Sequence, residues 1–348
     1  MNLYNKAIAI ISHSSLSVRK NILILITFLV VFICIVSILT IYFSKIYPLI
    51  IGLIILSFGL GLRHAVDADH IAAIDNTTRK FMHEGKKPVF VGLFFSLGHS
   101  TIVILLSLFL ALSANFVRNT IPQFEQVGAI IGTSVSSFFL LIIGIINLIT
   151  FLEIFHNFVH VVKHKSVLIA HAHTHLHTSG FLMKIFKPFV KTISKEWHMY
   201  FLGFLFGLGF DTASEIALLT ISASSTDKLP FFAIMLLPLS FTAGMALIDS
   251  LDAVLMLGAY GWAFIKPIRK LYYNLTITFI SVFIALFIGG LEALQLISQL
   301  LHINSAFFSF INTISISNLG MFIIILFILC WLVSIIFYKL NKFDKLLQ

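Results

Sequence analysis

Five ionisable residues stand close together in an apolar stretch of the chain, within Arg-His-Ala-Val-Asp-Ala-Asp-His-Ile at residues 63–71. At about 100° per residue, His64, Asp67 and His70 fall on one side of a helix, and Asp69 points away from that side. Neutral imidazoles are ligands for first-row transition metals, whereas all-oxygen sites suit magnesium and calcium. The spacing therefore indicates half of a transition-metal site. The alternative is a polar cap where a helix meets the cytoplasm.

Three further segments place polar residues in apolar surroundings. His99 lies among hydroxyl side chains, where a histidine either binds a ligand or hydrogen-bonds a neighbouring helix. Two acidic pairs have helical spacing, i, i+4 for Asp211 and Glu215 and i, i+3 for Asp249 and Asp252. Acidic groups on one face repel each other unless a proton or a cation lies between them. These residues are therefore candidate ligands or counter-charges for a cation.

The composition indicates what surrounds these residues. Of the 348 residues, 59% are hydrophobic and only 11% are charged, with a mean hydropathy of +1.04. A soluble domain has roughly 25% charged residues, so we predict an all-α integral membrane protein, because backbone groups in lipid must bond each other. Eight apolar runs predict transmembrane helices near residues 21–43, 47–74, 89–113, 127–151, 198–221, 231–258, 271–298 and 319–339.

The distribution of positive charge predicts the orientation. Lys and Arg number 19 on the side that holds both termini and three on the other side, and one more lies within a span. Because cytoplasmic loops are enriched in Lys and Arg, both termini are predicted to be cytoplasmic. We interpret residues 1–348 as a single transmembrane domain with one long cytoplasmic loop, residues 152–197.

Helix geometry predicts that the ionisable groups meet at one depth. At 1.5 Å per residue, His64, His99 and Asp249 each lie about 14–15 Å from the inner end of their spans, and Asp211 lies about 20 Å from its own. A charged group at bilayer depth costs about 2.5–3.5 kcal/mol on insertion scales, which makes it a functional candidate by default. We therefore predict a shared cation site near the midplane.

Together, the four segments resemble the signature motifs of the nickel/cobalt transporter family (NiCoT). They occur in the family's order: Arg-His-Ala-Val-Asp-Ala-Asp-His-Ile at 63–71, Leu-Gly-His-Ser-Thr at 97–101, Leu-Gly-Phe-Asp-Thr-Ala-Ser-Glu-Ile at 208–216, and Gly-Met-Ala-Leu-Ile-Asp-Ser-Leu-Asp at 244–252. The resemblance covers most of residues 46–258. Ser214 and Ser250 are mild departures, since many members have threonine there.

The resemblance implies an eight-helix permease of the cytoplasmic membrane with high affinity and low capacity for Ni²⁺, and often also for Co²⁺. It implies that His64, Asp67, Asp69 and His70 are central to recognition and transport. The remaining motif residues carry over as further members of the site: His99, Asp211, Glu215, Asp249 and Asp252.

The resulting hypothesis is uptake of Ni²⁺ or Co²⁺ as a transported substrate. His64, Asp67, His70 and His99 would replace the ion's water shell, the acidic residues would line the path, and Arg63 would pair with an acidic group. The sequence contains no Gly-x-x-x-x-Gly-Lys-Ser/Thr motif, so we expect no ATPase subunit. We expect the metal ion and the lipid bilayer as partners, and no nucleic acid, cofactor or enzymatic activity. An exporter of the same ions and an intramembrane metalloenzyme are the alternatives.

Two features stand apart from the motifs. Four histidines alternate within the long loop and form either a cytoplasmic metal buffer or part of a basic linker: His171, His173, His175 and His177. The tetrapeptide Phe-Gly-Leu-Gly occurs at 58–61 and again at 206–209, in spans predicted to run in opposite directions. This echo is compatible with an inverted repeat.

Overall fold

The computed structural model describes residues 16–112, 114–164, 193–209, 229–263, 267–303 and 305–316, and the single positions 218, 221, 222, 225, 319, 320, 322, 323, 325, 326, 329 and 333. In this part of the chain all regular elements are helices, as the composition predicts. They are α2 (Leu16–Ser44), α3 (Ile50–His64), α4 (Ala68–His83), α5 (Val91–Leu112), α6 (Ala114–His164), α8 (His198–Phe206), the 3₁₀ turn η2 (Gly207–Gly209), α10 (Phe231–Ile234), α11 (Leu236–Ala263), α12 (Pro267–Leu300) and α13 (Ala306–Thr313).

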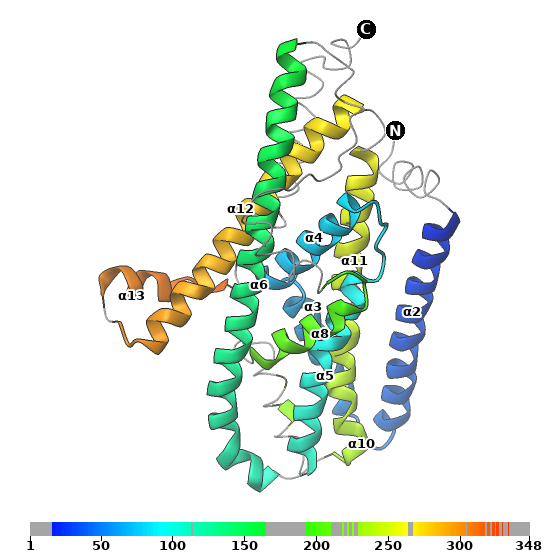
Figure 1. Ribbon diagram of the computed structural model, residues 1–348. Helices are drawn as coiled ribbons and strands as arrows, with labels where there is room; N and C mark the ends of the chain where they lie inside the picture. Colours follow the sequence, from blue (N-terminus) through cyan, green and yellow to red (C-terminus); the bar gives the residue numbers. More distant parts are fainter. Residues whose placement is uncertain are drawn as a thin grey trace.

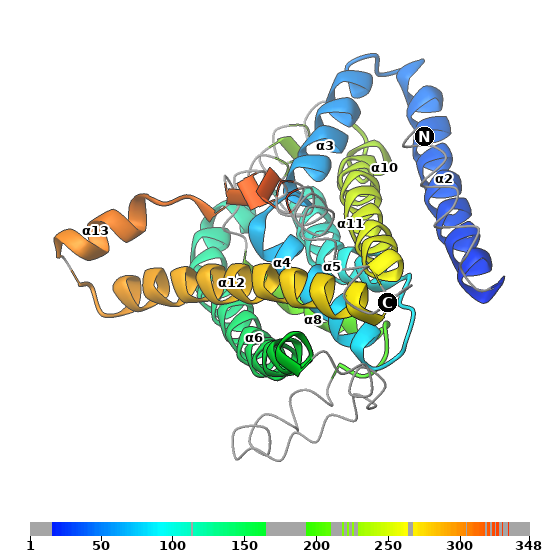
Figure 2. The same cartoon turned by 90° about the horizontal axis from the view of Figure 1, so that it is seen from above.

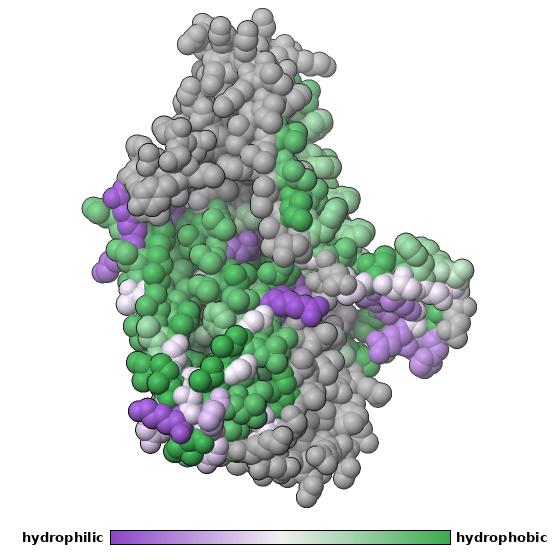
Figure 3. All heavy atoms as spheres, turned by 180° about the vertical axis from the view of Figure 1, so that it is seen from behind, coloured by the Kyte–Doolittle hydropathy of each residue, from purple (hydrophilic) through white to green (hydrophobic). Residues whose placement is uncertain are grey.

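Several of these helices can cross a membrane. Over the described ranges, five helical segments are long and apolar enough, and α3 with α4 would form a sixth, bent span. The five segments are Leu16–Ser44, Val91–Phe109, Ala129–Ile149, Phe231–Gly258 and Thr278–Leu300. Apolar side chains make up most of the coloured part of the face in Figure 3. The chain is therefore a multi-pass membrane protein.

The second predicted span is wrong in one respect, because residues 47–74 are not one straight helix. α3 ends at His64, α4 begins at Ala68, and the two axes differ by 57°. Between them Asp67 has an extended backbone, with φ −66° and ψ 146°. Residues 65–67 contain no proline or glycine. The break therefore depends on contacts made by the turn, among them the close approach of Gly320 to the carbonyl of Val66.

The other predicted spans differ mainly at their ends. α6 is a continuous helix of 51 residues that ends at His164, so the beginning of the predicted loop 152–197 is helical. The fifth predicted span, 198–221, is α-helical only to Phe206 before the turn η2 begins. Most of the eighth, 319–339, lies outside the described residues. The short helix α13 precedes it and was not predicted.

Helix α4 lies among α5, α6, α11 and α12, near the middle of the bundle, as Figure 1 and Figure 2 show. Around it, α11 packs closely on α3 and α5 packs closely on α8. Glycines permit both contacts: a Cβ atom on Gly61 or Gly244 would meet the backbone of the other helix of the first pair, and one on Gly98 or Gly203 that of the second. Small residues bring transmembrane helices together in this way.

Candidate metal centre

Three histidines from three helices converge next to the break between α3 and α4. His64 is the last residue of α3, His70 lies in the first turn of α4, and His99 lies in the middle of α5. One ring nitrogen from each lies within 4.8 Å of the others. The ring centroids are 4.6 to 4.9 Å apart, so the rings form a nearly equilateral triangle. The arrangement can hold one metal ion between three imidazoles.

Two carboxylates set the orientation of these rings. Asp67 Oδ2 lies 3.1 Å from His64 Nδ1, and Asp249 Oδ1 lies 3.4 Å from His70 Nδ1. An ionised carboxylate only accepts hydrogen bonds, so each Nδ1 carries the proton and each Nε2 is left with a lone pair. Metal-binding histidines in proteins commonly donate their other N–H to a carboxylate in this way. In this arrangement Asp67 can orient the ring of His64; its role as a direct ligand stays a prediction.

The Nε2 atoms of His64 and His99 face each other. His64 Nε2 lies 2.9 Å from His99 Nε2; when His64 is neutral and donates from Nδ1 to an ionised Asp67, His99 is the donor in this contact. His70 Nε2 is buried and has no hydrogen-bond partner within the described residues. A metal ion would take up these lone pairs and displace the His99 proton, because coordinating imidazoles must be unprotonated on the ligating atom.

The centre is buried and has apolar walls. His64, His70 and His99 are each at most 3% exposed. The Phe95 ring lies edge-on to His70 at 4.8 Å, and the Phe241 ring lies 5.5 Å from His64. Low polarity around a site strengthens interactions between an ion and its ligands. The walls therefore favour binding of an ion that has lost its water.

The break in the helix is what brings His64 and His70 together. Asp67 is the N-cap of α4, a position that favours Asp, but its side chain bonds His64 and makes no cap. Asp69 Oδ1 instead accepts the backbone N–H of His70 at 2.9 Å. The two acidic residues of the motif thus have separate tasks, Asp67 at the ring and Asp69 at the helix start.

The remaining predicted site residues lie elsewhere. Arg63 is exposed, and its pairing with an acidic group stays a prediction. Asp252 lies one turn beyond Asp249 on α11. Several predicted site residues lie outside the described residues, together with most of the predicted loop: Asp211, Glu215, His171, His173, His175 and His177.

Comparison with known proteins places this chain in a family. The model of the NicO family, described as high-affinity nickel-transport protein, matches residues 50–337. The chain belongs to the NicO family. The match begins at the start of α3 and includes every residue of the candidate centre. Helix α2 precedes it.

Individual relatives of this NicO protein are similar over most of their length. The high-affinity nickel transport protein of Cupriavidus necator is 45% identical over 301 residues, 86% of each chain. The nickel transporter NixA of Staphylococcus aureus is 44% identical over 302 residues, 86% of this chain and 89% of its own. The cobalt transport protein NhlF of Rhodococcus rhodochrous is 37% identical over 250 residues, 71% of each. No solved structure matches the chain.

Sequence reasoning missed a group of buried polar residues in this NicO protein. Arg79 falls in the connection between the predicted spans 47–74 and 89–113, but it lies in α4 and is 1% exposed. Asp75 and Asn76 on the same helix are also buried. The signal was present, since Asp-Asn-Thr-Thr-Arg at 75–79 follows the motif directly, but a straight span would have ended at residue 74.

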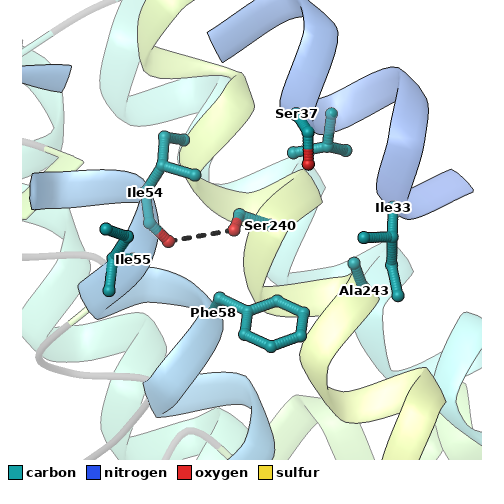
Figure 4. Close-up of a pocket in the computed structure, with 8 residues that line it drawn as sticks. Ile33, Ser37, Ile54, Ile55, Phe58, Ser240 and Ala243 are labelled. Carbon is teal, nitrogen blue, oxygen red and sulfur yellow. Dashed lines mark hydrogen bonds between the residues drawn. The ribbon is translucent and has the colours of Figure 1, made fainter. Parts of the chain in front are cut away.

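The apolar pocket in Figure 4 is separate from the centre. It has a volume of about 230 Å³ and lies between α2, α3 and α11. Ser240 Oγ donates to the carbonyl of Ile54 there, at 3.0 Å. Its lining contains no titratable side chain: Ile33, Val36, Ser37, Ile54, Ile55, Phe58, Ser240 and Ala243. The pocket therefore offers no ligand for a metal ion.

Proposed function

We propose that this protein is a secondary transporter that takes up Ni²⁺, with Co²⁺ as a second substrate, through the buried centre formed by His64, His70 and His99. The observation that carries the proposal is the convergence of three imidazoles from α3, α4 and α5 in a chain of the NicO family. Relatives named as nickel and cobalt transporters support both ions. The protein acts as a transporter and not as an enzyme, and it needs no cofactor.

The proposed mechanism replaces water by nitrogen ligands. A hydrated ion reaches the break between α3 and α4, and the Nε2 atoms of the three histidines take the place of water molecules. Asp67 and Asp249 hold two of the rings in the ligating tautomer and supply negative charge close to the ion. Asp69, Asp211, Glu215 and Asp252 remain proposed as residues of the path. The His-rich loop remains proposed as a cytoplasmic buffer.

The proposed setting is the cell membrane, with eight spans, both termini in the cytoplasm and one permease domain over residues 1–348. The excess of Lys and Arg on one side supports this topology. Inward movement of a dication gains about 4.6 kcal/mol per 100 mV of inside-negative potential. The membrane potential can therefore drive uptake without an ATPase subunit.

Uptake of ⁶³Ni²⁺ by cells that express single variants tests the proposal. His64→Ala, His70→Ala and His99→Ala should each lose uptake, because each removes one of three nitrogen ligands. His302→Asn is a matched control, since His302 is exposed and has a positive φ of 49°, which asparagine tolerates. It should take up nickel at the wild-type rate.

Three outcomes bear on the alternatives. Wild-type uptake by all three histidine variants, at equal amounts of protein in the membrane, would refute the centre. Lower cellular nickel on expression of the wild type would indicate export. Competition by Co²⁺, Zn²⁺ and Mn²⁺ would rank the substrates, because imidazole ligands alone do not select nickel over its neighbours.

A further inference from the structure

A second group of buried polar side chains follows the histidine centre along the bundle. Helices α4 and α11 pack against each other and run toward the same end of the molecule, which Figure 1 shows at the top. At 1.5 Å per residue, Asp75 lies about 7.5 Å beyond His70 along α4, and Asp252 lies about 4.5 Å beyond Asp249 along α11. The end that they approach is the predicted cytoplasmic end. Each helix therefore has an acidic residue on the predicted cytoplasmic side of the centre.

These acidic residues act on one another electrostatically. The charged groups that act on Asp252 are Asp75 and Asp249, both of the same sign. Asp249 is 1% exposed, and its Oδ2 atom has no hydrogen-bond partner within the described residues. Asp252 Oδ2 is likewise buried without such a partner. Buried acceptors without a donor are costly, and like charges repel each other unless a proton or a cation lies between them, so this position favours a cation.

The donor atoms of this group are all oxygens. Asp75 is fixed on one side by Ser281 of α12, whose hydroxyl donates to Asp75 Oδ2 at 2.5 Å. Imidazole nitrogen suits nickel and cobalt, whereas carboxylate oxygen suits harder cations. An oxygen-only position should therefore hold the same ion more weakly than the histidine centre. Passage through a membrane requires binding that is weak enough, or divided among enough sites, for the ion to leave.

We propose that Asp75 and Asp252, with Asp249 between them and the histidines, form a second, oxygen-only station that receives the divalent ion from the histidine centre and passes it toward the cytoplasm. The inference rests on the proposed transport function and adds Asp75 to its path. Asp249 joins the two positions, because its Oδ1 faces His70 and its Oδ2 is free of partners in the described residues.

A buried cation marks the far end of the station. Arg79 lies one turn beyond Asp75, and i, i+4 spacing puts the two on the same face of α4. Its Nη2 donates to Asn76 Oδ1 at 3.0 Å, and the same oxygen accepts from Asn147 Nδ2 at 2.7 Å. Its Nε and Nη1 have no hydrogen-bond partner in the described ranges. The guanidinium opposes long residence of a dication at Asp75 and compensates the carboxylates when no ion is there.

The experiment separates binding from passage. Asp75→Asn and Asp252→Asn are compared with wild type for ⁶³Ni²⁺ uptake by cells and for Ni²⁺ binding to the purified protein in detergent. We expect tight binding within about threefold of wild type, because the histidine centre is intact, and a maximal uptake rate at least about tenfold lower. Glu84→Gln is the matched control, since Glu84 lies on the connection between α4 and α5. It should leave both quantities unchanged.

The outcomes are distinct from those for the histidine centre. Uptake within twofold of wild type for both aspartate variants would overturn the second station, and so would a parallel loss of tight binding and uptake. If one variant fails to reach the membrane, the other decides the test, because the two residues lie on different helices. His64→Ala is measured alongside: wild-type uptake by that variant refutes the transport site itself, whatever the aspartate variants do.

Discussion

The hydrogen bond from His64 to Asp67 provides the sharpest test of the centre. The two atoms lie 3.1 Å apart, and both side chains are at most 3% exposed. Asparagine has nearly the shape of aspartate, but its amide group can donate to Nδ1 of His64. That donation would move the imidazole proton to Nε2, where it would block the metal ion. We therefore expect Asp67→Asn to weaken Ni²⁺ binding although no ligand is removed.

The size of the effect follows from the role of Asp67. Loss of an orienting carboxylate behind a metal-binding histidine typically costs 10- to 100-fold in affinity, or about 1.4–2.7 kcal/mol. The matching contact from Asp249 to His70 is longer, at 3.4 Å. Asp249→Asn should therefore weaken binding less than Asp67→Asn, near the lower end of that range. Asp67→Ala, which removes the acceptor without adding a donor, should be no worse than Asp67→Asn.

The assay is competition for Ni²⁺ between the purified protein and a chromogenic chelator, with ⁶³Ni²⁺ uptake measured below saturation in parallel. Both should fall by the same factor, because the loss is in binding. Wild-type affinity in Asp67→Asn, together with loss of binding in His64→Ala, would refute the assignment of the tautomer. A larger loss of Ni²⁺ affinity in Asp249→Asn than in Asp67→Asn would contradict the order inferred from the two distances.

Four further predictions follow, three on the scaffold and one on the His-rich loop. Glu196 Oε2 accepts the backbone N–H groups at the start of α5, so Glu196→Ala should cost about 1–2 kcal/mol, seen as a lower midpoint of thermal unfolding in detergent. Burial raises the pKa of Glu196 despite these bonds, so the folded protein binds the proton more readily than the unfolded chain. The free energy of unfolding of the wild type should therefore rise relative to that of Glu196→Gln as the pH falls from the raised pKa to the ordinary value. Gly203→Ala should cost about 1–3 kcal/mol through overpacking and lower uptake, whereas Gly52→Ala, with nothing within 4 Å of the new Cβ, should not. Deletion of residues 171–177 should leave uptake measurable, which a buffering role allows and an obligatory relay does not.

Much of the centre could be predicted from the sequence, because motifs and helix depth are local properties. Equal distances from the ends of the spans placed His64, His99 and Asp249 at one level, and the structure brings them together. The sequence correctly predicted that His64 and His70 lie close together, but for the wrong reason, since the prediction placed both on one face of a straight helix. In the structure they meet because the helix breaks between them.

The break itself could not be predicted, because its causes are not local. Residues 65–67 are Ala, Val and Asp, none of which forbids a helix. The contacts that stabilise the turn come from the ring of His64 and from Gly320, about 250 positions further along the chain. The misplacement of Arg79 has the same origin. A straight span ends before this residue, whereas the bent one carries it into the bundle.

The position of the centre explains why a glycine outside it should affect transport. His64 belongs to α3, which the Gly61 and Gly244 contacts hold against α11, and His99 belongs to α5, which Gly98 and Gly203 hold against α8. The 2.9 Å contact between the two Nε2 atoms therefore joins one helix pair to the other. A metal–nitrogen bond is about 2.0–2.1 Å long. A shift of a few tenths of an ångström between the pairs would therefore move the nitrogens away from the distance that an ion needs. An added methyl group at Gly203 acts on that spacing directly, because it would meet the backbone of α5 at the carbonyl of Phe95 and at the amide nitrogen of His99.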